Sequence, residues 1–431
     1  MAHSGYSPAV ALPRLRLAPW LAETAFVALL LMVFIGLMPF APRDATTLAI
    51  GESGFAGAGD ATRQILYLLV LVATVGAALE LRGLRAFRAI PIPLAVLLGW
   101  CLLSASWAPA PDVALRRAVL EIVVVVSAML GVDSIGVERA LRLLRAMLAL
   151  VLIVNWISIA LLPQAVHLPG EADPSLVGDW RGIYFHKNIA GAVSALSAIV
   201  FLFFAVETRR IIDFVLFAGA VGFTLMTQSK SSIGLLPVAL GLAWIYRIAW
   251  KRGIDRAILA LGLGLLLVVA VTVAIADSGL IARVLEDPTE FTGRTAIWQG
   301  EIAFLRDHPL LGAGFGSFAD TGASSPLHSY VSSAWIENEA HGHNAYLQLL
   351  VTVGGIGFAL AMIAFVVQPL AAFLRATSAD LPLKSLLFAI FAFMILHNFL
   401  ESDFLEGDGA AWVAFLLMLA MLRRSRQEAV G

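Results

Sequence analysis

Two short polar segments of the chain carry side chains that could bind an anion. Residues 179–188 contain Arg181, His186 and Lys187, and residues 292–298 place Arg294 where a helix is expected to begin. An arginine offers a planar fork of donors that suits phosphate oxygens, and a helix N-terminus adds free N–H groups and a positive dipole end. Together they predict a pyrophosphate-binding site. Alternatively, these cations contact lipid headgroups or a loop carboxylate.

A third segment, residues 339–348, carries a candidate general base. His343 directly precedes an apolar run, and the dipole at the start of the expected helix favours a neutral imidazole that can accept a proton. Asn344 and Gln348 are four residues apart, so both amides would share a helix face and orient a sugar hydroxyl. Two alternatives remain: a metal site built from His341, His343 and Glu339, or a histidine that only lies at the membrane interface.

Two further groups are supporting candidates for the same site. His397 and Glu401 have the i,i+4 spacing of one helix face, so they are expected to pair with each other or with an outer arginine, for catalysis or only for structure. Lys230 lies in the polar turn 228–232, which is costly next to hydrocarbon. It is expected to line a wet cavity, unless the turn is only a hairpin.

The composition indicates a membrane protein. The 431 residues are 60% hydrophobic and only 14% charged, whereas a soluble domain of this size carries about 25% charged residues. Twenty-nine basic residues balance 30 acidic ones, which argues against nucleic acid as a partner. The single cysteine, Cys101, excludes an intrachain disulfide and a cysteine-rich metal site.

Long apolar stretches predict an all-α, polytopic transmembrane helical bundle of about 12 spans, because each crossing needs roughly 20 mostly apolar residues. No cleavable signal peptide is evident, so the first stretch is read as the first span. The pair of spans around 227–232 is the least clear. The predicted spans are 24–42, 64–80, 89–111, 113–132, 146–170, 188–206, 212–228, 231–248, 257–276, 340–374, 383–400 and 409–422.

The distribution of basic residues predicts the orientation. With the N-terminus in the cytoplasm, most Lys and Arg residues fall inside, as the positive-inside rule requires. Residues 1–277 then hold spans 1–9, residues 278–342 form a large, partly helical periplasmic loop, and residues 343–431 hold spans 10–12 with a cytoplasmic C-terminus. Long outer connections of this kind are usually functional. Seven of the eight histidines fall on the outer side: His167, His186, His308, His328, His341, His343 and His397.

Three motifs resemble those of one known family. His343 and Asn344, followed after nine residues by the Gly-Gly-Ile-Gly of 354–357, resemble the signature of the O-antigen ligase and polymerase family of membrane glycosyltransferases. Residues 293–298 look like that family's Arg-bearing element in its large periplasmic loop, and residues 185–191 look like its other outer element. The motifs occur in family order, and the resemblance covers roughly residues 150–405.

The resemblance implies an enzyme of the bacterial inner membrane that needs neither metal nor cofactor. It would transfer a glycan from undecaprenyl pyrophosphate to a sugar hydroxyl at the periplasmic face, with inversion. Arg181 and Arg294 would hold the pyrophosphate, and His343 would be the general base. The supporting substrate-binding residues would be His186, Lys187, Lys230, Asn344 and His397.

The acceptor and the partners are left open by these motifs. Family members glycosylate lipid A–core, a growing lipid-linked polysaccharide or a protein, and the His-Lys-Asn element at 186–188 favours the exopolysaccharide polymerase branch. Chain-length or export proteins are expected partners besides the donor, the acceptor and the bilayer. The alternatives are a multi-pass transporter of an envelope precursor, which predicts polar residues near the bilayer midplane, and a non-catalytic membrane scaffold.

Overall fold

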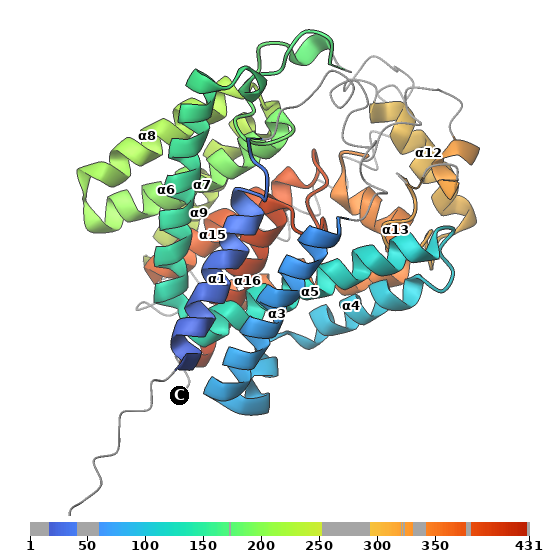
Figure 1. Ribbon diagram of the computed structural model, residues 1–431, viewed down its shortest axis with the longest axis horizontal. Helices are drawn as coiled ribbons and strands as arrows, with labels where there is room; N and C mark the ends of the chain where they lie inside the picture. Colours follow the sequence, from blue (N-terminus) through green and yellow to red (C-terminus); the bar gives the residue numbers. More distant parts are fainter. Residues whose placement is uncertain are drawn as a thin grey trace, which may run out of the picture.

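The computed structural model describes residues 17–40, 60–171, 174–251, 294–319, 321, 324–330, 342–375 and 381–428. Within these ranges the regular structure is helical, and an isolated bridge pairs Val166 with Trp180 (Figure 1). The predicted all-α class is therefore confirmed.

The helices overlap the predicted apolar stretches. Eleven of the twelve predicted spans overlap a helix, although α1 and α6 lie earlier in the chain than predicted, and the stretch 257–276 lies outside the described residues. The first half of the chain contains α1 (Leu17–Phe34), α3 (Ala61–Arg82), η2 (Gly83–Ala89), α4 (Ile92–Ser104), α5 (Pro111–Ile135), α6 (Val137–Leu161), α7 (Lys187–Thr208), α8 (Ile211–Met226) and α9 (Lys230–Lys251). The second half contains α12 (Arg294–Asp307), α13 (Ala345–Met362), the π-turn η9 (Ile363–Val367), α14 (Gln368–Phe373), α15 (Leu381–His397) and α16 (Ala410–Glu428).

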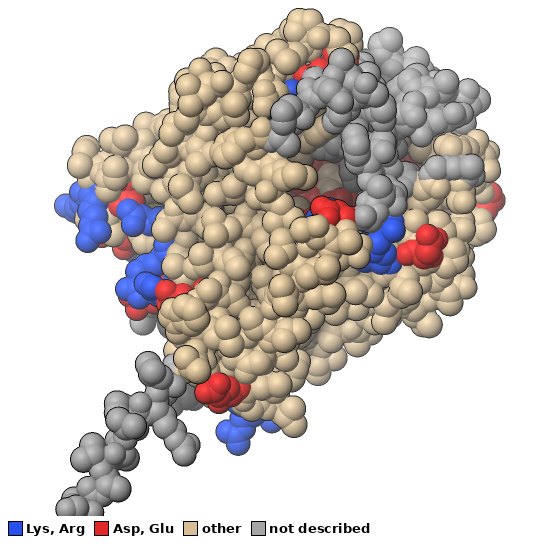
Figure 2. Space-filling view, viewed as in Figure 1, with Lys and Arg blue, Asp and Glu red and all other residues tan. Residues whose placement is uncertain are grey.

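Seven helical segments among the described residues are long and apolar enough to cross a membrane, and α4, α8 and α15 are shorter apolar helices. Figure 2 shows that most of the visible face is uncharged, with Lys, Arg, Asp and Glu confined to separate clusters. A wide uncharged surface is what hydrocarbon requires of the helices that face it. These features are those of a multi-pass membrane protein.

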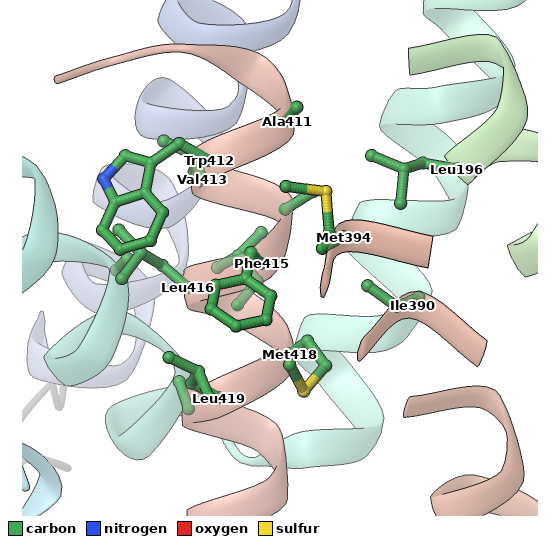
Figure 3. Close-up of a cluster of buried hydrophobic side chains, with 14 of the residues drawn as sticks. Leu196, Ile390, Met394, Ala411, Trp412, Val413, Phe415, Leu416, Met418 and Leu419 are labelled. Carbon is green, nitrogen blue, oxygen red and sulfur yellow. The ribbon is translucent and has the colours of Figure 1, made fainter. Parts of the chain in front are cut away.

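Helix α16 lies at the centre of the packing. Its residues 410–422 are almost all buried, Trp412 and Phe415 completely so. Figure 3 shows its side chains beside Leu196 of α7 and Met394 of α15. Close van der Waals packing is a main force between helices in a membrane. Helix α16 therefore anchors α7 and α15, and candidate site residues lie at the start of α7 and the end of α15.

Helix α13 is interrupted at Gly354, which has φ 68° and ψ −178°. The segment that follows α12 fills the break: the N–H of Gly355 donates to the carbonyl of Pro309 at 2.9 Å, and the N–H of Ala313 donates to Val351 at 2.8 Å. A β-carbon on Gly354 would collide with the backbone of Leu310. The Gly-Gly-Ile-Gly motif thus lets two backbones approach, which glycine alone permits at this conformation.

Candidate active site

Four parts of the chain meet at the carboxylate of Glu401, in the loop between α15 and α16. Its Oε1 accepts hydrogen bonds from Asn188 Nδ2 at 2.9 Å and from Ser231 Oγ at 3.3 Å. Its Oε2 lies 3.1 Å from Nδ1 of His343. Asn188 is near the start of α7, Ser231 near the start of α9, and His343 just before α13. The carboxylate therefore joins three helix N-termini.

His343 stands where the sequence predicted it, at the start of α13. Asn344 caps that helix, because its Oδ1 accepts from the N–H groups of Tyr346 and Leu347, both at 3.1 Å. When Nδ1 of His343 donates to Glu401, the lone pair on Nε2 can accept a proton. The side chain of His343 is 26% exposed, so the imidazole can be reached. A base oriented by a carboxylate is the arrangement that proton-abstracting histidines use.

The loop that carries Glu401 is tied to the start of α13 and to its own first residue. The N–H of Ala345 donates to the carbonyls of Asn398 and Glu401, at 2.9 and 3.0 Å. Oδ1 of Asn398 accepts from the N–H groups of Asp403 and Phe404, at 2.9 and 3.0 Å. These bonds hold the backbone on both sides of Glu401 against the helix that His343 precedes.

The far end of the same loop is fixed to the bundle. The buried carboxylate of Glu121 on α5 accepts from Gly407 N at 2.9 Å and from Trp412 Nε1 at 2.7 Å. Asp408 pairs with Arg63 and accepts from the hydroxyl of Tyr67 at 2.7 Å. The loop that carries Glu401 is therefore bonded to α3 and α5 at its far end.

Where Figure 1 draws this red loop, Figure 2 shows a recess bordered by acidic and basic side chains.

The sequence predicted that His397 and Glu401 share one face of a helix, but the helix ends before Glu401. Helix α15 ends at His397, so Glu401 follows in the loop and faces His343. His397 is buried, with Nδ1 2.7 Å from Asp403 Oδ2 and Nε2 3.3 Å from Ser232 Oγ. These contacts place His397 at the edge of the site, next to the loop that carries Glu401.

Arg181 is buried and forms an ion pair with Glu171. Its Nη1 and Nη2 donate to the two carboxylate oxygens of Glu171 at 3.1 and 2.9 Å. Its Nε donates to the carbonyl of Gln164 at 2.8 Å, and Nη1 also lies 3.2 Å from the carbonyl of Phe185. With its donors in use, Arg181 ties together the loop that ends at α7. It would have to leave Glu171 to hold a pyrophosphate directly.

His186 and Lys187 lie side by side at the start of α7 but differ in charge. His186 is the N-cap of α7: its Nδ1 accepts from Asn188 N at 3.2 Å. Burial lowers the pKa of His186 to about 3, so the imidazole is uncharged at neutral pH. Of the three potential cations that the sequence places in this segment, His186 is the one whose pKa is lowered. Lys187 pairs with Asp179 at 2.6 Å.

His167, in the loop before α7, was named from the sequence only as one of the outer histidines. Nδ1 of His167 lies 2.6 Å from Glu171 Oε2, and its Nε2 accepts from Lys187 N at 3.2 Å. Burial lowers the pKa of His167. His167 and Glu171 are four residues apart, and this spacing is the sequence feature that could have predicted their contact. Both residues brace the start of α7.

The remaining predicted residues fall at helix starts or outside the described residues. Lys230 is the exposed first residue of α9, while the neighbouring Ser231 and Ser232 are buried and face Glu401 and His397. Arg294 is the first described residue of α12, so residue 294 is helical as expected; its side chain lies outside the described part of the structure. His341 and Glu339 of the alternative metal site also lie outside the described residues.

Comparison with known proteins supports the resemblance to this family. Residues 214–362 match the family model described as O-antigen ligase, a range that includes Arg294, His343 and the glycine motif. The chain is 28% identical over 314 residues to the "Exopolysaccharide production protein ExoQ" of Rhizobium meliloti (strain 1021), a match that covers 69% of each chain. The resemblance to the O-antigen ligase and polymerase family is confirmed.

Proposed function

We propose that this protein transfers a glycan from undecaprenyl pyrophosphate to a sugar hydroxyl at the periplasmic face of a bacterial inner membrane. The observation that carries the proposal is the pair formed by His343 and Glu401, 3.1 Å apart at the start of α13. The family match supports transfer of a glycan within a membrane. The likeness to an exopolysaccharide production protein favours a growing polysaccharide as the acceptor.

In the proposed reaction His343 acts as the general base. Its Nε2 takes the proton of the acceptor hydroxyl, and the oxygen attacks the anomeric carbon of the donor glycan. The bond from that carbon to the pyrophosphate oxygen breaks on the opposite side, so the anomeric configuration inverts. Glu401 stabilises the imidazolium that forms. General base catalysis of this kind contributes about 10²–10⁴ in rate.

The leaving group is undecaprenyl pyrophosphate, whose negative charge grows as the bond breaks. Arg294 begins α12, where a cation and the free N–H groups of a helix N-terminus both favour a phosphate. Lys187 and Lys230 lie at the starts of α7 and α9, the helices that contribute Asn188 and Ser231 to Glu401. The exposed Lys230 adds positive charge for the donor, Lys187 would have to leave Asp179 to do so, and the buried Arg181 positions α7 through Glu171.

Purified protein in nanodiscs tests the proposal directly. It is incubated with undecaprenyl-pyrophosphate-linked glycan in the presence of EDTA, with either a second lipid-linked glycan or lipid A–core as acceptor, and the products are resolved by mass. A longer lipid-linked glycan is the expected product, and glycosylated lipid A–core would instead identify a ligase. Folded protein that yields neither product, but moves the lipid-linked glycan across sealed vesicles, would replace the proposal with a transporter.

A further inference from the structure

Helix α12 contacts the backbone residue that precedes His343. Nε1 of Trp298 donates to the carbonyl of Gly342 at 2.6 Å. The carboxyl group of Glu301 also packs against this residue: Oε2 is 2.7 Å, and the carboxyl carbon 2.8 Å, from the position that a β-carbon on Gly342 would occupy. Trp298 and Glu301 are three residues apart and share one face of α12. Gly342 is thus held by two side chains of one helix.

Glu301 is an unusual group to find in this place. It is 1% exposed, and its Oε2 has no hydrogen-bond partner among the described residues. Burial raises the pKa of Glu301 to about 8, because a carboxylate removed from water without a partner is costly. At neutral pH Glu301 is therefore an uncharged carboxylic acid packed against Gly342.

His343 needs this support because its backbone is strained. It has φ 49°, a left-handed conformation that costs a residue with a side chain on the order of 1–3 kcal/mol unless its surroundings hold it. On the C-terminal side Asn344 caps α13. On the N-terminal side the described contacts are those of Trp298 and Glu301 with Gly342.

The chain beyond α12 holds the other end of the same half-helix. The N–H of Ala313 donates to Val351 at 2.8 Å, and the N–H of Gly355 donates to Pro309 at 2.9 Å. The first half of α13, from Ala345 to the break at Gly354, is therefore attached to α12 and its continuation at both ends. A displacement of α12 would act on the backbone of Gly342 and His343, while the bonds of Ala345 to Asn398 and Glu401 hold the start of α13 in place.

We propose that Glu301 is a positioning residue, which together with Trp298 holds Gly342 and thereby places the His343 imidazole on Glu401. The effect on transfer rests on the proposed function, whereas the protonation of Glu301 can be measured without it. Ionisation of Glu301 would put an unpaired charge against the backbone of Gly342. Transfer should then fall as the pH rises through the titration of this group.

Within the part of the chain that the structure describes, no neighbouring titratable group supplies Glu301 with a charged partner. Helix α13 and the turn η7 (Pro326–Ser329) pack against α12. Tyr346 of α13 donates to the carbonyl of Ile395, and His328 of η7 is exposed. Tyr330, after η7, donates to Asp307 at the end of α12. Burial is accordingly the cause of the raised pKa of Glu301.

Thermal unfolding of the detergent-solubilised protein tests the uncharged state. The pKa of a glutamate is ordinarily 4.5, as expected in the unfolded chain, whereas that of Glu301 in the folded protein is about 8. Between these values the folded state binds the extra proton, so wild-type stability falls as the pH rises. Glu301→Gln removes this dependence, and its Tm relative to wild type should therefore rise steadily from pH 5 to pH 8. The exposed Glu80→Gln is the control, with no such trend. A Tm difference that does not change with pH would overturn the assignment.

Glycan transfer tests the positioning. Glu301→Gln should keep the wild-type kcat at pH 7 and lose the decline that wild type shows above pH 8. Gly342→Ala places a methyl group on the carboxyl and should lower kcat by about 10², the typical cost of a displacement of 1 Å. Adding Glu301→Ala to Gly342→Ala removes the carboxyl group that the new methyl group contacts, so part of the lost kcat should be recovered. An unchanged alkaline decline in Glu301→Gln, or Gly342→Ala with wild-type kcat, would overturn the positioning role. Wild-type protein without transfer would instead reject the proposed function and leave the Tm result standing.

Discussion

The N-termini of α7 and α13 each carry a histidine, and the two imidazoles make different contacts. His186 caps α7 with its own Nδ1 and is half-buried, and desolvation lowers its pKa to about 3. At α13 the cap is Asn344, one residue after His343. The His343 imidazole therefore does not cap the helix, and its Nδ1 contacts the carboxylate of Glu401 instead.

The difference shows what makes a histidine at a helix start available for catalysis. A histidine that satisfies the helix's own N–H groups has one ring nitrogen occupied. A histidine beside a dedicated cap can use one nitrogen for an orienting carboxylate and the other for a substrate proton. Asn188 links the two sites, because it follows the α7 cap and donates to Glu401 at 2.9 Å. We therefore expect α7 to support the base and α13 to carry it.

Matched substitutions of the two histidines should give the largest difference. Asparagine is a favoured N-cap and tolerates left-handed backbone, so it fits both positions. His343→Asn should lower kcat by about 10²–10⁴, because the general base is lost. His186→Asn should keep kcat within a few-fold of wild type, because the cap is retained. Rates of glycan transfer measured at equal amounts of folded protein make this comparison, and equal losses in the two variants would refute it.

Substitution of Arg181 tests whether this residue supports α7 or binds the lipid-linked donor. Arg181→Ala leaves the carboxylate of Glu171 buried and without its arginine, which should cost about 3–5 kcal/mol of unfolding free energy. Adding Glu171→Gln should recover part of this loss. Denaturant unfolding measures both variants. Arg181→Ala with wild-type stability and a raised KM for the lipid-linked donor would instead make Arg181 a pyrophosphate ligand.

Glu401→Gln should have a smaller effect than the loss of His343. The amide keeps the size of the side chain but no longer stabilises the imidazolium, so we expect kcat to fall by about 10², less than the largest losses known for orienting carboxylates. The KM for the donor should change little, because Glu401 acts through His343. A large change in KM with an unchanged kcat would mean that Glu401 binds substrate directly.

The positions of the helices were predictable because hydrophobic stretches long enough to span a bilayer have few other uses. The placement of His343 before a capped helix was also predictable, since the helix start follows from local sequence. The pairing with Glu401 was not, because the two residues are 58 positions apart and meet only after α13 and α15 pack. The lowered pKa of His186 was not predictable either, because the desolvation that causes it depends on the whole fold.

Chemical rescue of His343→Gly tests the role of His343 as the base most directly. Glycine suits the left-handed backbone at position 343, which has φ 49°, so the variant should fold and leave a gap beside Glu401. We expect that transfer is lost and that added imidazole restores part of it, with no such response in His186→Gly. Wild-type transfer by His343→Gly without imidazole would contradict the assignment of His343 as the base.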